Sequence, residues 1–223
     1  MAPAITLRSA VALLGRFPAL AGVDLDVEEG SVLAALGSNG AGKTTLLHLL
    51  AGLLPMRSGT GTVLGCDLAT DRAPLRRRVG LLGHHLSLYP DLSASENLIF
   101  ALRAAGLDRA LAAPSLERVG LTGRLATAPA RELSAGQQRR MGLASLIARR
   151  PSLWLLDEPH AGLDGAGRDL CDELVDEAAR GGATVVLTSH EKDRAASCAD
   201  QMVTLTGGAV SASEAGARQL HVA

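Results

Sequence analysis

Apolar and polar residues alternate along the first part of the chain. Ile5–Leu7 and Val23–Val27 place apolar side chains at every second position, which is typical of half-buried β-strands. We therefore expect a small antiparallel sheet from Ala4 to about Glu28. The pattern then changes, because Ser31–Leu36 is an almost continuous apolar run. Such a run predicts a strand that is buried on both faces.

A glycine-rich turn and a nearly apolar segment from Thr44 to about Leu54 follow this strand directly. The order of buried strand, glycine turn and buried helix predicts the first unit of a parallel α/β sheet. Later apolar runs at Ser152–Leu156 and Ala183–Thr188, with a helical pattern at Gly167–Arg180 between them, predict further strands of that sheet.

The middle of the chain has a different character. Residues 86–150 are rich in Ala, Leu and Arg at helical spacing, with Gly and Pro breaks. We expect one domain over residues 1–223, in which residues 1–85 and 151–210 form the α/β core with the N-terminal sheet. Residues 86–150 then form an inserted helical part. The small polar tail at 211–223 is expected to be frayed.

Composition narrows the possible partners. The chain has 22 Lys and Arg residues, 23 Asp and Glu residues and a formal net charge of −1, with only 2% aromatic residues. It therefore lacks the cationic surface and the stacking rings of non-specific nucleic-acid binding, so we expect no nucleic-acid partner. Three widely spaced cysteines predict free thiols. We expect neither a membrane span nor a signal peptide, since Arg8 and Arg16 interrupt the apolar N-terminal stretch.

A phosphate-binding loop is predicted between the first buried strand and its helix. The segment fits the pattern GxxxxGK[ST], in which backbone N–H groups and the helix N-terminus surround a triphosphate. Lys43 would reach the terminal phosphates, and Thr44 would bind Mg²⁺ through its hydroxyl. The alternative is an ordinary glycine turn with a solvated lysine. The expected nucleotide-binding residues are Gly37, Ser38, Asn39, Gly40, Ala41, Gly42, Lys43, Thr44 and Thr45.

Two adjacent carboxylates end the strand before Pro159. Asp157 is suited to the Mg²⁺ shell and Glu158 to orienting or deprotonating a water. Taken alone, Asp-Glu-Pro would be an ordinary turn, but with a phosphate loop it predicts a hydrolysis site. His190 ends the later strand, where an imidazole would contact a γ-phosphate. A lone histidine there is otherwise most often a core residue.

A capped helix is predicted from Ser134 to about Arg149, with Pro151 beyond its end. Its first residues, Leu133–Gln137, resemble the LSGGQ signature of ABC-type ATPases, with Ala135 in place of a glycine. The other motifs of that family follow in order, including Ala161–Asp164, which resembles the D-loop. The resemblance covers essentially the whole chain. It implies a P-loop NTPase fold with a RecA-like parallel core, an antiparallel β-subdomain and an inserted helical subdomain.

The resemblance also implies partners. Two copies would bind head to tail, with ATP and Mg²⁺ held by Lys43, Thr44, Asp157, Glu158 and His190 of one copy. The other copy would contribute its signature residues, which are Ser134, Ala135, Gly136 and Gln137, and Asp164 would act in the D-loop. The dimer would drive separate integral-membrane permease subunits from the cytoplasmic face of the inner membrane, as a peripheral protein.

The sequence departs from the family at two positions. The Q-loop glutamine should fall within Gly83–Leu86, where His84 or His85 stands instead, and counting from different landmarks favours one or the other. The aromatic residue that stacks on adenine is also missing, because Leu14 occupies its expected place. Either adenine binding is looser or Phe17 supplies the ring.

Within the family, the stretches at 37–47, 83–85 and 133–140 resemble the haem-exporter ATPases of cytochrome c maturation. That resemblance implies a permease of the CcmB/CcmC type. ATPases of drug, polysaccharide or lipid exporters remain the alternative, and a non-transport ABC ATPase is a further one. A GTPase is disfavoured because the chain has no Asn-Lys-x-Asp motif, and neither a GTPase nor a small-molecule kinase needs the signature segment.

Overall fold

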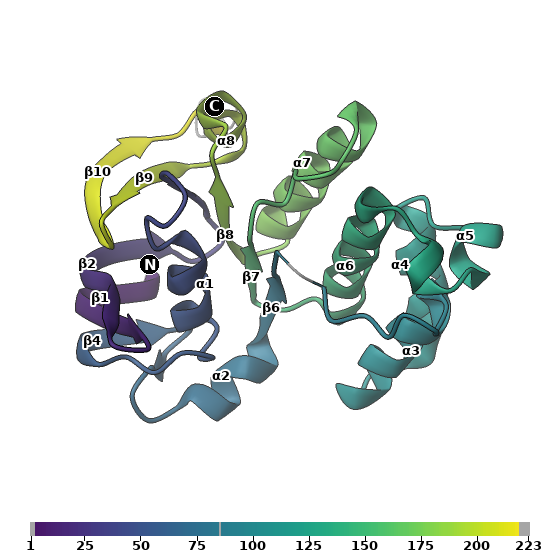
Figure 1. Cartoon of the computed structure of the whole chain (residues 1–223), viewed down its shortest axis with the longest axis horizontal. Helices are drawn as coiled ribbons and strands as arrows, with labels where there is room; N and C mark the ends of the chain where they lie inside the picture. Colours follow the sequence, from purple (N-terminus) through teal and green to yellow (C-terminus); the bar gives the residue numbers. More distant parts are fainter. Residues whose placement is uncertain (1–2, 85, 219–223) are drawn as a thin grey trace. The chain divides into compact units, whose positions relative to one another are not determined.

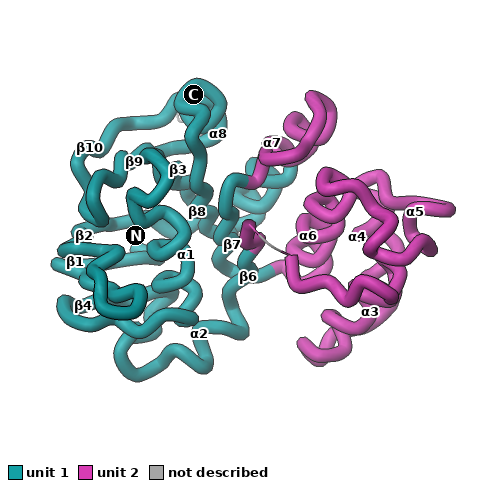
Figure 2. The backbone as a smooth tube through the Cα atoms, viewed as in Figure 1, with its two compact units in different colours: residues 1–81, 151–158, 174–223 teal, residues 82–150, 159–173 magenta. Residues whose placement is uncertain are grey.

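The computed structural model describes residues 3–84 and 86–218. These residues divide into two compact units (Figure 2). Unit 1 contains residues 1–81, 151–158 and 174–223, and unit 2 contains residues 82–150 and 159–173. The helical unit thus takes in the stretch directly after Glu158, which the sequence had assigned to the core.

Unit 1 contains both sheets (Figure 1). The N-terminal residues form the predicted antiparallel sheet, in the order β2-β1-β4-β5. Its strands are β1 (Pro3–Leu14), β2 (Phe17–Glu28), β4 (Ser58–Val63) and β5 (Cys66–Asp67). Along β2 buried and exposed residues alternate from Val23 to Glu28, as the sequence pattern predicts.

The second sheet has the order β10-β9-β3-β8-β7-β6. Its strands are β3 (Val32–Leu36), β6 (Val79–Leu82), β7 (Leu153–Leu156), β8 (Thr184–Ser189), β9 (Gln201–Thr206) and β10 (Ala209–Ala215). Strand β8 pairs in parallel with both β3 and β7. Every residue of these three strands is buried, which explains the apolar sequences of β3 and β7 and of the centre of β8.

The helices of unit 1 are α1 (Lys43–Leu50), α2 (Arg72–Arg78) and α8 (Lys192–Cys198). Leucines of α1 and apolar residues of both sheets form one hydrophobic core. The prediction of a frayed tail is wrong for residues 211–215. They belong to β10, which pairs with β9 in an antiparallel ladder and so satisfies its backbone groups.

Unit 2 is helical. It contains α3 (Ala94–Ala104), α4 (Ala112–Arg118), α5 (Arg124–Thr127), α6 (Ala135–Arg149) and the first part of α7 (Gly165–Arg180). Short 3₁₀ turns lie at Arg109–Leu111 and Ala130–Glu132. Both α3 and α6 begin with a capping box, at Ser93 and Ser134. The predicted start of the helix at Ser134 is confirmed.

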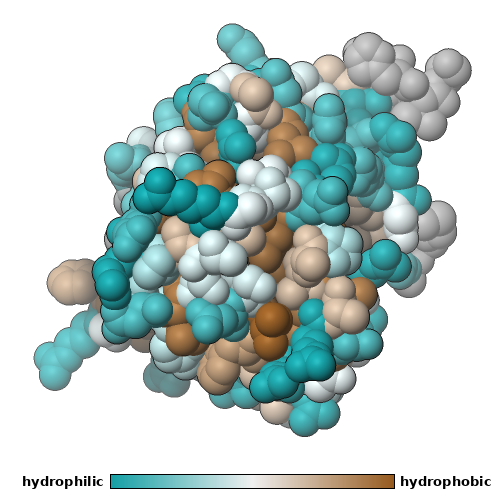
Figure 3. Space-filling view, turned by 90° about the vertical axis from the view of Figure 1, so that its right-hand side faces the viewer, coloured by the Kyte–Doolittle hydropathy of each residue, from teal (hydrophilic) through white to brown (hydrophobic). Residues whose placement is uncertain are grey.

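No helix in the described part of the chain combines the length and apolar character needed to cross a bilayer. Figure 3 shows one face of the molecule, on which apolar residues are exposed between polar ones. Among residues 3–84 and 86–218, the most exposed large apolar residue is Phe17, at 80%. In unit 2, Tyr89 and Phe100 are half exposed and form an edge-to-face pair with ring centroids 4.9 Å apart.

Candidate active site

Three strand ends bring the predicted catalytic residues of unit 1 together. The phosphate loop follows β3, Asp157 follows β7, and His190 follows β8. Because β8 lies between β3 and β7 and runs parallel to both, the carboxyl ends of all three strands meet at one edge of the sheet. This is where open α/β sheets bind ligands.

The phosphate loop is shaped for close backbone approach. Gly42 caps α1 with φ of +106°, and a Cβ there would come within 2.6 Å of the Ala19 carbonyl oxygen. Ser38, Asn39 and Gly40 are exposed, so the outer side of the loop is open to a ligand. Lys43 is buried, and its Nζ donates to the Gly37 carbonyl at 2.6 Å. The ammonium is therefore held inside the loop.

Two threonines hold the carboxylate of Asp157. Thr44 Oγ1 donates to Asp157 Oδ2 at 2.8 Å, and Thr188 Oγ1 donates to Asp157 Oδ1 at 2.7 Å. Thr188 Oγ1 also accepts the backbone N–H of Glu158 at 2.9 Å. Asp157 and Thr188 are buried. The hydroxyl of Thr188 thus fixes both acidic residues, which the sequence prediction missed. Its position two residues before His190 on a buried strand was the available signal.

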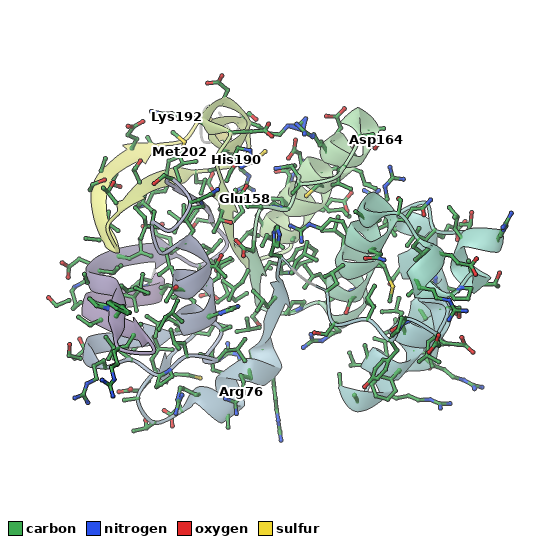
Figure 4. All side chains as sticks on the ribbon, viewed as in Figure 1. Arg76, Glu158, Asp164, His190, Lys192 and Met202 are labelled. Atoms are coloured by element: carbon green, nitrogen blue, oxygen red, sulfur yellow. The ribbon has the colours of Figure 1, made fainter. Side chains whose placement is uncertain are left out.

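Glu158 has a specific and strained geometry. One carboxylate oxygen, Oε2, lies 2.9 Å from His190 Nδ1, and the other lies 3.6 Å from Lys43 Nζ. Figure 4 shows the side chains of Glu158 and His190 close together. The φ of Glu158 is +47°, in the left-handed region that costs a non-glycine residue about 1–3 kcal/mol. Strain of this kind is characteristic of functional positions.

The oxygen donors at this edge fit Mg²⁺. A hydroxyl and a carboxylate are hard ligands, and Mg²⁺ in nucleotide sites is held by one or two protein groups together with phosphates and water. Thr44 and Asp157 supply these two groups, already within 2.8 Å of each other. No group of three or more His, Cys, Asp or Glu residues that could hold a metal ion occurs among the described residues. The donor set therefore suits a magnesium–nucleotide complex better than an all-protein metal site.

The signature segment lies in unit 2. Ser134 Oγ accepts the backbone N–H of Gln137 at 3.2 Å, while Gln137 Oε1 accepts the N–H of Ser134 at 2.9 Å. Ser134 and Ala135 are exposed, and Gly136 and Gln137 are partly exposed. The start of α6 is therefore accessible to solvent, and the N-terminus of a helix suits an anionic ligand.

Asp164, in the predicted D-loop, is also part of unit 2. Its carboxylate accepts the backbone N–H of Gly167 at 2.9 Å and the guanidinium of Arg140 at 2.9 Å. The hydrogen bond from the Gly167 N–H is the main reason why the pKa of Asp164 lies below its ordinary value, and the charge of Arg140 lowers this pKa further. Desolvation has the opposite effect but does not outweigh them.

The two departures from the family pattern are only partly described. His84 is exposed and lies in unit 2, and His85 lies outside the described residues. Leu14 and Phe17 are paired across the β1–β2 hairpin, so their side chains share one face of it. Ala19, two residues after Phe17, contributes the carbonyl that lies against Gly42 of the phosphate loop. Phe17 is therefore two residues along the chain from a residue that lies against the phosphate loop.

Comparison with known proteins decides the family. The ABC transporter family matches residues 20–161. The chain belongs to the ABC transporter family. This ABC protein is 42% identical to the cytochrome c biogenesis ATP-binding export protein CcmA of Rhodopseudomonas palustris, over 76% of this chain and 83% of that protein.

Other relatives of this ABC protein are much longer. It is 38% identical to ATP-binding cassette sub-family A member 7 of Mus musculus over 86% of this chain, but it spans only 9% of that protein. Among solved structures, it resembles the dimeric ATP-binding cassette MJ0796 with ADP and Pi bound. That match has a TM-score of 0.86 at 26% identity and covers 95% of this chain and 98% of the other.

These findings confirm the predicted P-loop NTPase fold of ABC type. They also confirm the predicted class: the ABC protein is an ATP-binding subunit that couples ATP hydrolysis to transport.

The sequence analysis did not predict three groups of unit 2 that lie around the predicted D-loop. These are Arg139, Arg140, and the pair of buried His160 and partly exposed Asp172.

Proposed function

We propose that this protein powers a haem-handling transporter of cytochrome c assembly, together with a separate permease of the CcmB/CcmC type. The observation that carries the proposal is the match to CcmA of Rhodopseudomonas palustris over 83% of that protein's length. CcmA of Bordetella bronchiseptica gives the same identity, 42%, over 82% of this chain. The substrate is either haem itself or a haem-loaded chaperone that the complex releases.

The proposed catalytic work is divided among residues of unit 1. Lys43 and the loop Gly37–Thr45 bind the phosphates, and Thr44 and Asp157 hold Mg²⁺. When bound, Mg²⁺ neutralises charge on the phosphate oxygens. Glu158 orients the attacking water and accepts its proton, and His190, whose ring lies 2.9 Å from Glu158, contacts the γ-phosphate.

The proposed site is completed by a second copy of the chain. Ser134, Ala135, Gly136 and Gln137 of that copy would meet the nucleotide through the backbone donors and side chains at the start of α6. Their exposure in the single chain supports this role. Asp164 would act in the D-loop of the same interface. Nucleotide binding would favour the closed dimer, and hydrolysis would release it.

The proposed location is the cytoplasmic face of the inner membrane, through contact with the permease. His84 or His85 would occupy the Q-loop position that faces the permease. The edge-to-face pair of Tyr89 and Phe100 follows this position along the chain. Both residues are half exposed in the single subunit, which supports a binding surface here.

The alternative is the ATPase of another exporter. The human relative, a phospholipid-transporting ATPase named ABCA7, is 35% identical over 93% of this chain, which spans 10% of that protein.

Copurification of the tagged protein with its permease from the native membrane distinguishes the two proposed functions. Under the haem proposal, the tagged protein brings down a permease that purifies with haem, and deleting the gene removes mature c-type cytochromes. Copurification with a lipid or drug permease, with normal c-type cytochromes in the deletion strain, would establish the alternative.

A further inference from the structure

Arg139 joins two separate segments of unit 2. It lies on α6, two residues beyond the signature segment, and is only 5% exposed. One guanidinium nitrogen donates to the Gly83 carbonyl at 2.6 Å, and Nε donates to the Pro159 carbonyl at 3.3 Å. Gly83 follows the end of β6 and Pro159 follows Glu158, so both carbonyls lie where the chain has just left unit 1.

The segment after Pro159 has its own anchors. His160 is buried, and its Nε2 lies 2.6 Å from Asp172 Oδ1 on α7. Asp164, at the far end of the segment, binds Arg140 of α6. Gly136 of α6 packs so closely here that a Cβ would come within 2.7 Å of the Gly162 carbonyl oxygen. Residues 159–164 are therefore fastened to α6 and α7 along their whole length.

Glu158 is fastened to unit 1 instead. Its N–H binds Thr188, and its carboxylate meets His190 and Lys43. A single peptide bond thus separates a glutamate held by unit 1 from a proline held by unit 2. The φ of +47° at Glu158 lies at this junction. A non-glycine residue keeps such a conformation only when its surroundings on both sides fix it.

We propose that Arg139 and the His160–Asp172 pair are positioning residues for Glu158. They make Pro159 move together with α6, the helix that begins at the signature segment. When nucleotide binds the signature segment, the displacement of α6 therefore reaches Glu158 through the Glu158–Pro159 peptide bond. Glu158 carries the carboxylate that activates water. Through its hydrogen bond to the Gly83 carbonyl, Arg139 also displaces Gly83, which lies beside the Q-loop position. This inference rests on the proposed catalytic role of Glu158.

The test uses the purified chain of 223 residues with MgATP. Arg139→Lys keeps the charge but removes the planar fork that reaches two carbonyls. His160→Leu and Asp172→Asn weaken the second anchor, and His160→Gln restores a donor to Asp172. We expect kcat to fall on the order of ten- to a hundredfold in Arg139→Lys and His160→Leu, because small misplacements of a catalytic group have effects of this size. The KM for ATP should change less than about twofold, and His160→Gln should recover most of kcat.

Arg118→Gln is the matched control. Arg118 also lies in unit 2 and pairs with Glu173 at 3.5 Å, but on an exposed surface. Its substitution should leave kcat unchanged. Thermal unfolding of each variant shows whether a lower kcat comes from misfolding or from misplacement of Glu158. If Arg139→Lys does not fold, the kcat values of the two His160 variants and of Asp172→Asn test the inference.

A double-mutant cycle tests whether these residues act through Glu158. In a Glu158→Gln background, Arg139→Lys and His160→Leu should have no further effect on the residual turnover. Additive losses in that background, or an unchanged kcat in all folded single variants, would overturn the inference. Near-normal turnover of Glu158→Gln alone would instead overturn the proposed role of Glu158, so the two failures are distinguishable.

Discussion

Thr44 and Asp157 lie 113 residues apart in the sequence and are joined by a hydrogen bond of 2.8 Å. The bond runs from the last residue of the phosphate-loop pattern to the first acidic residue after β7. It brings a hydroxyl and a carboxylate to one point at the carboxyl edge of the sheet, and such a pair of oxygen donors suits a magnesium–nucleotide complex. Thr188 completes the arrangement from the strand between them.

Replacing Thr188 should destabilise the fold. Thr188→Val keeps the shape but removes the hydroxyl that binds Asp157 and the N–H of Glu158, and both partners are then under-satisfied in a mostly buried place. We expect a loss of about 1–3 kcal/mol in the free energy of unfolding, measured by urea denaturation, and a lower kcat. Thr188→Ser, which retains the hydroxyl, should lose much less. Equal stability of the Val and Ser variants would show that the hydroxyl is unimportant.

Glu158→Gln should separate binding from hydrolysis. The amide has nearly the same shape as the carboxylate but cannot accept a proton. We therefore expect ATP binding to persist and kcat to fall about a hundredfold or more. Equilibrium nucleotide binding and single-turnover hydrolysis provide the two measurements. A variant with near-normal turnover would mean that another group activates the water.

The two capping boxes offer a matched pair of variants. Ser93→Ala and Ser134→Ala each remove an N-cap side chain, so each should cost about 1 kcal/mol of stability. Only Ser134→Ala should also lower kcat, by about tenfold or more, since only that cap belongs to the signature. Chemical denaturation and steady-state kinetics are compared on both variants. Similar kinetics for the two would remove Ser134 from the proposed site.

Phe17 is the candidate for contact with adenine. Its ring is 80% exposed, and it shares a hairpin face with Leu14. Stacking of a base on an aromatic ring is worth about 1–3 kcal/mol, so Phe17→Ala should raise the Kd for ATP about fivefold or more. Leu14→Ala is the control and should have a smaller effect. If binding is unchanged in Phe17→Ala, adenine is held elsewhere.

Asp164 should contribute stability that depends on pH. The Gly167 N–H and Arg140 lower its pKa in the folded state, so the unfolded chain takes up the proton first as the pH falls. The contribution is therefore fully present above the ordinary aspartate pKa of about 4 and is lost as the pH falls through the lower folded value. Comparing the unfolding of wild type and Asp164→Asn from neutral to acid pH should show the difference shrinking in acid. A constant difference would mean that the carboxylate charge does not matter.

Local patterns in the sequence were enough to predict most of the elements. The apolar run before Gly37 and the alternation in the N-terminal strands indicate burial directly, and Ser134 indicates a capped helix start, because each of these signals depends on neighbouring residues only. The tail was predicted wrongly, since the polar residues of β10 have no apolar pattern. Pairing with β9 decides that strand.

The sequence by itself indicated the family and predicted the phosphate loop, the acidic pair and the signature segment, because their residue types and spacing are carried along the chain. Only the tertiary structure decided that Thr188 holds both acidic residues and that Arg139 binds Gly83 and Pro159 together. It also decided that residues 159–173 belong with the helices and Glu158 with the sheet. Contacts of this kind join residues far apart in the chain, and their energy depends on burial and geometry that no local pattern records.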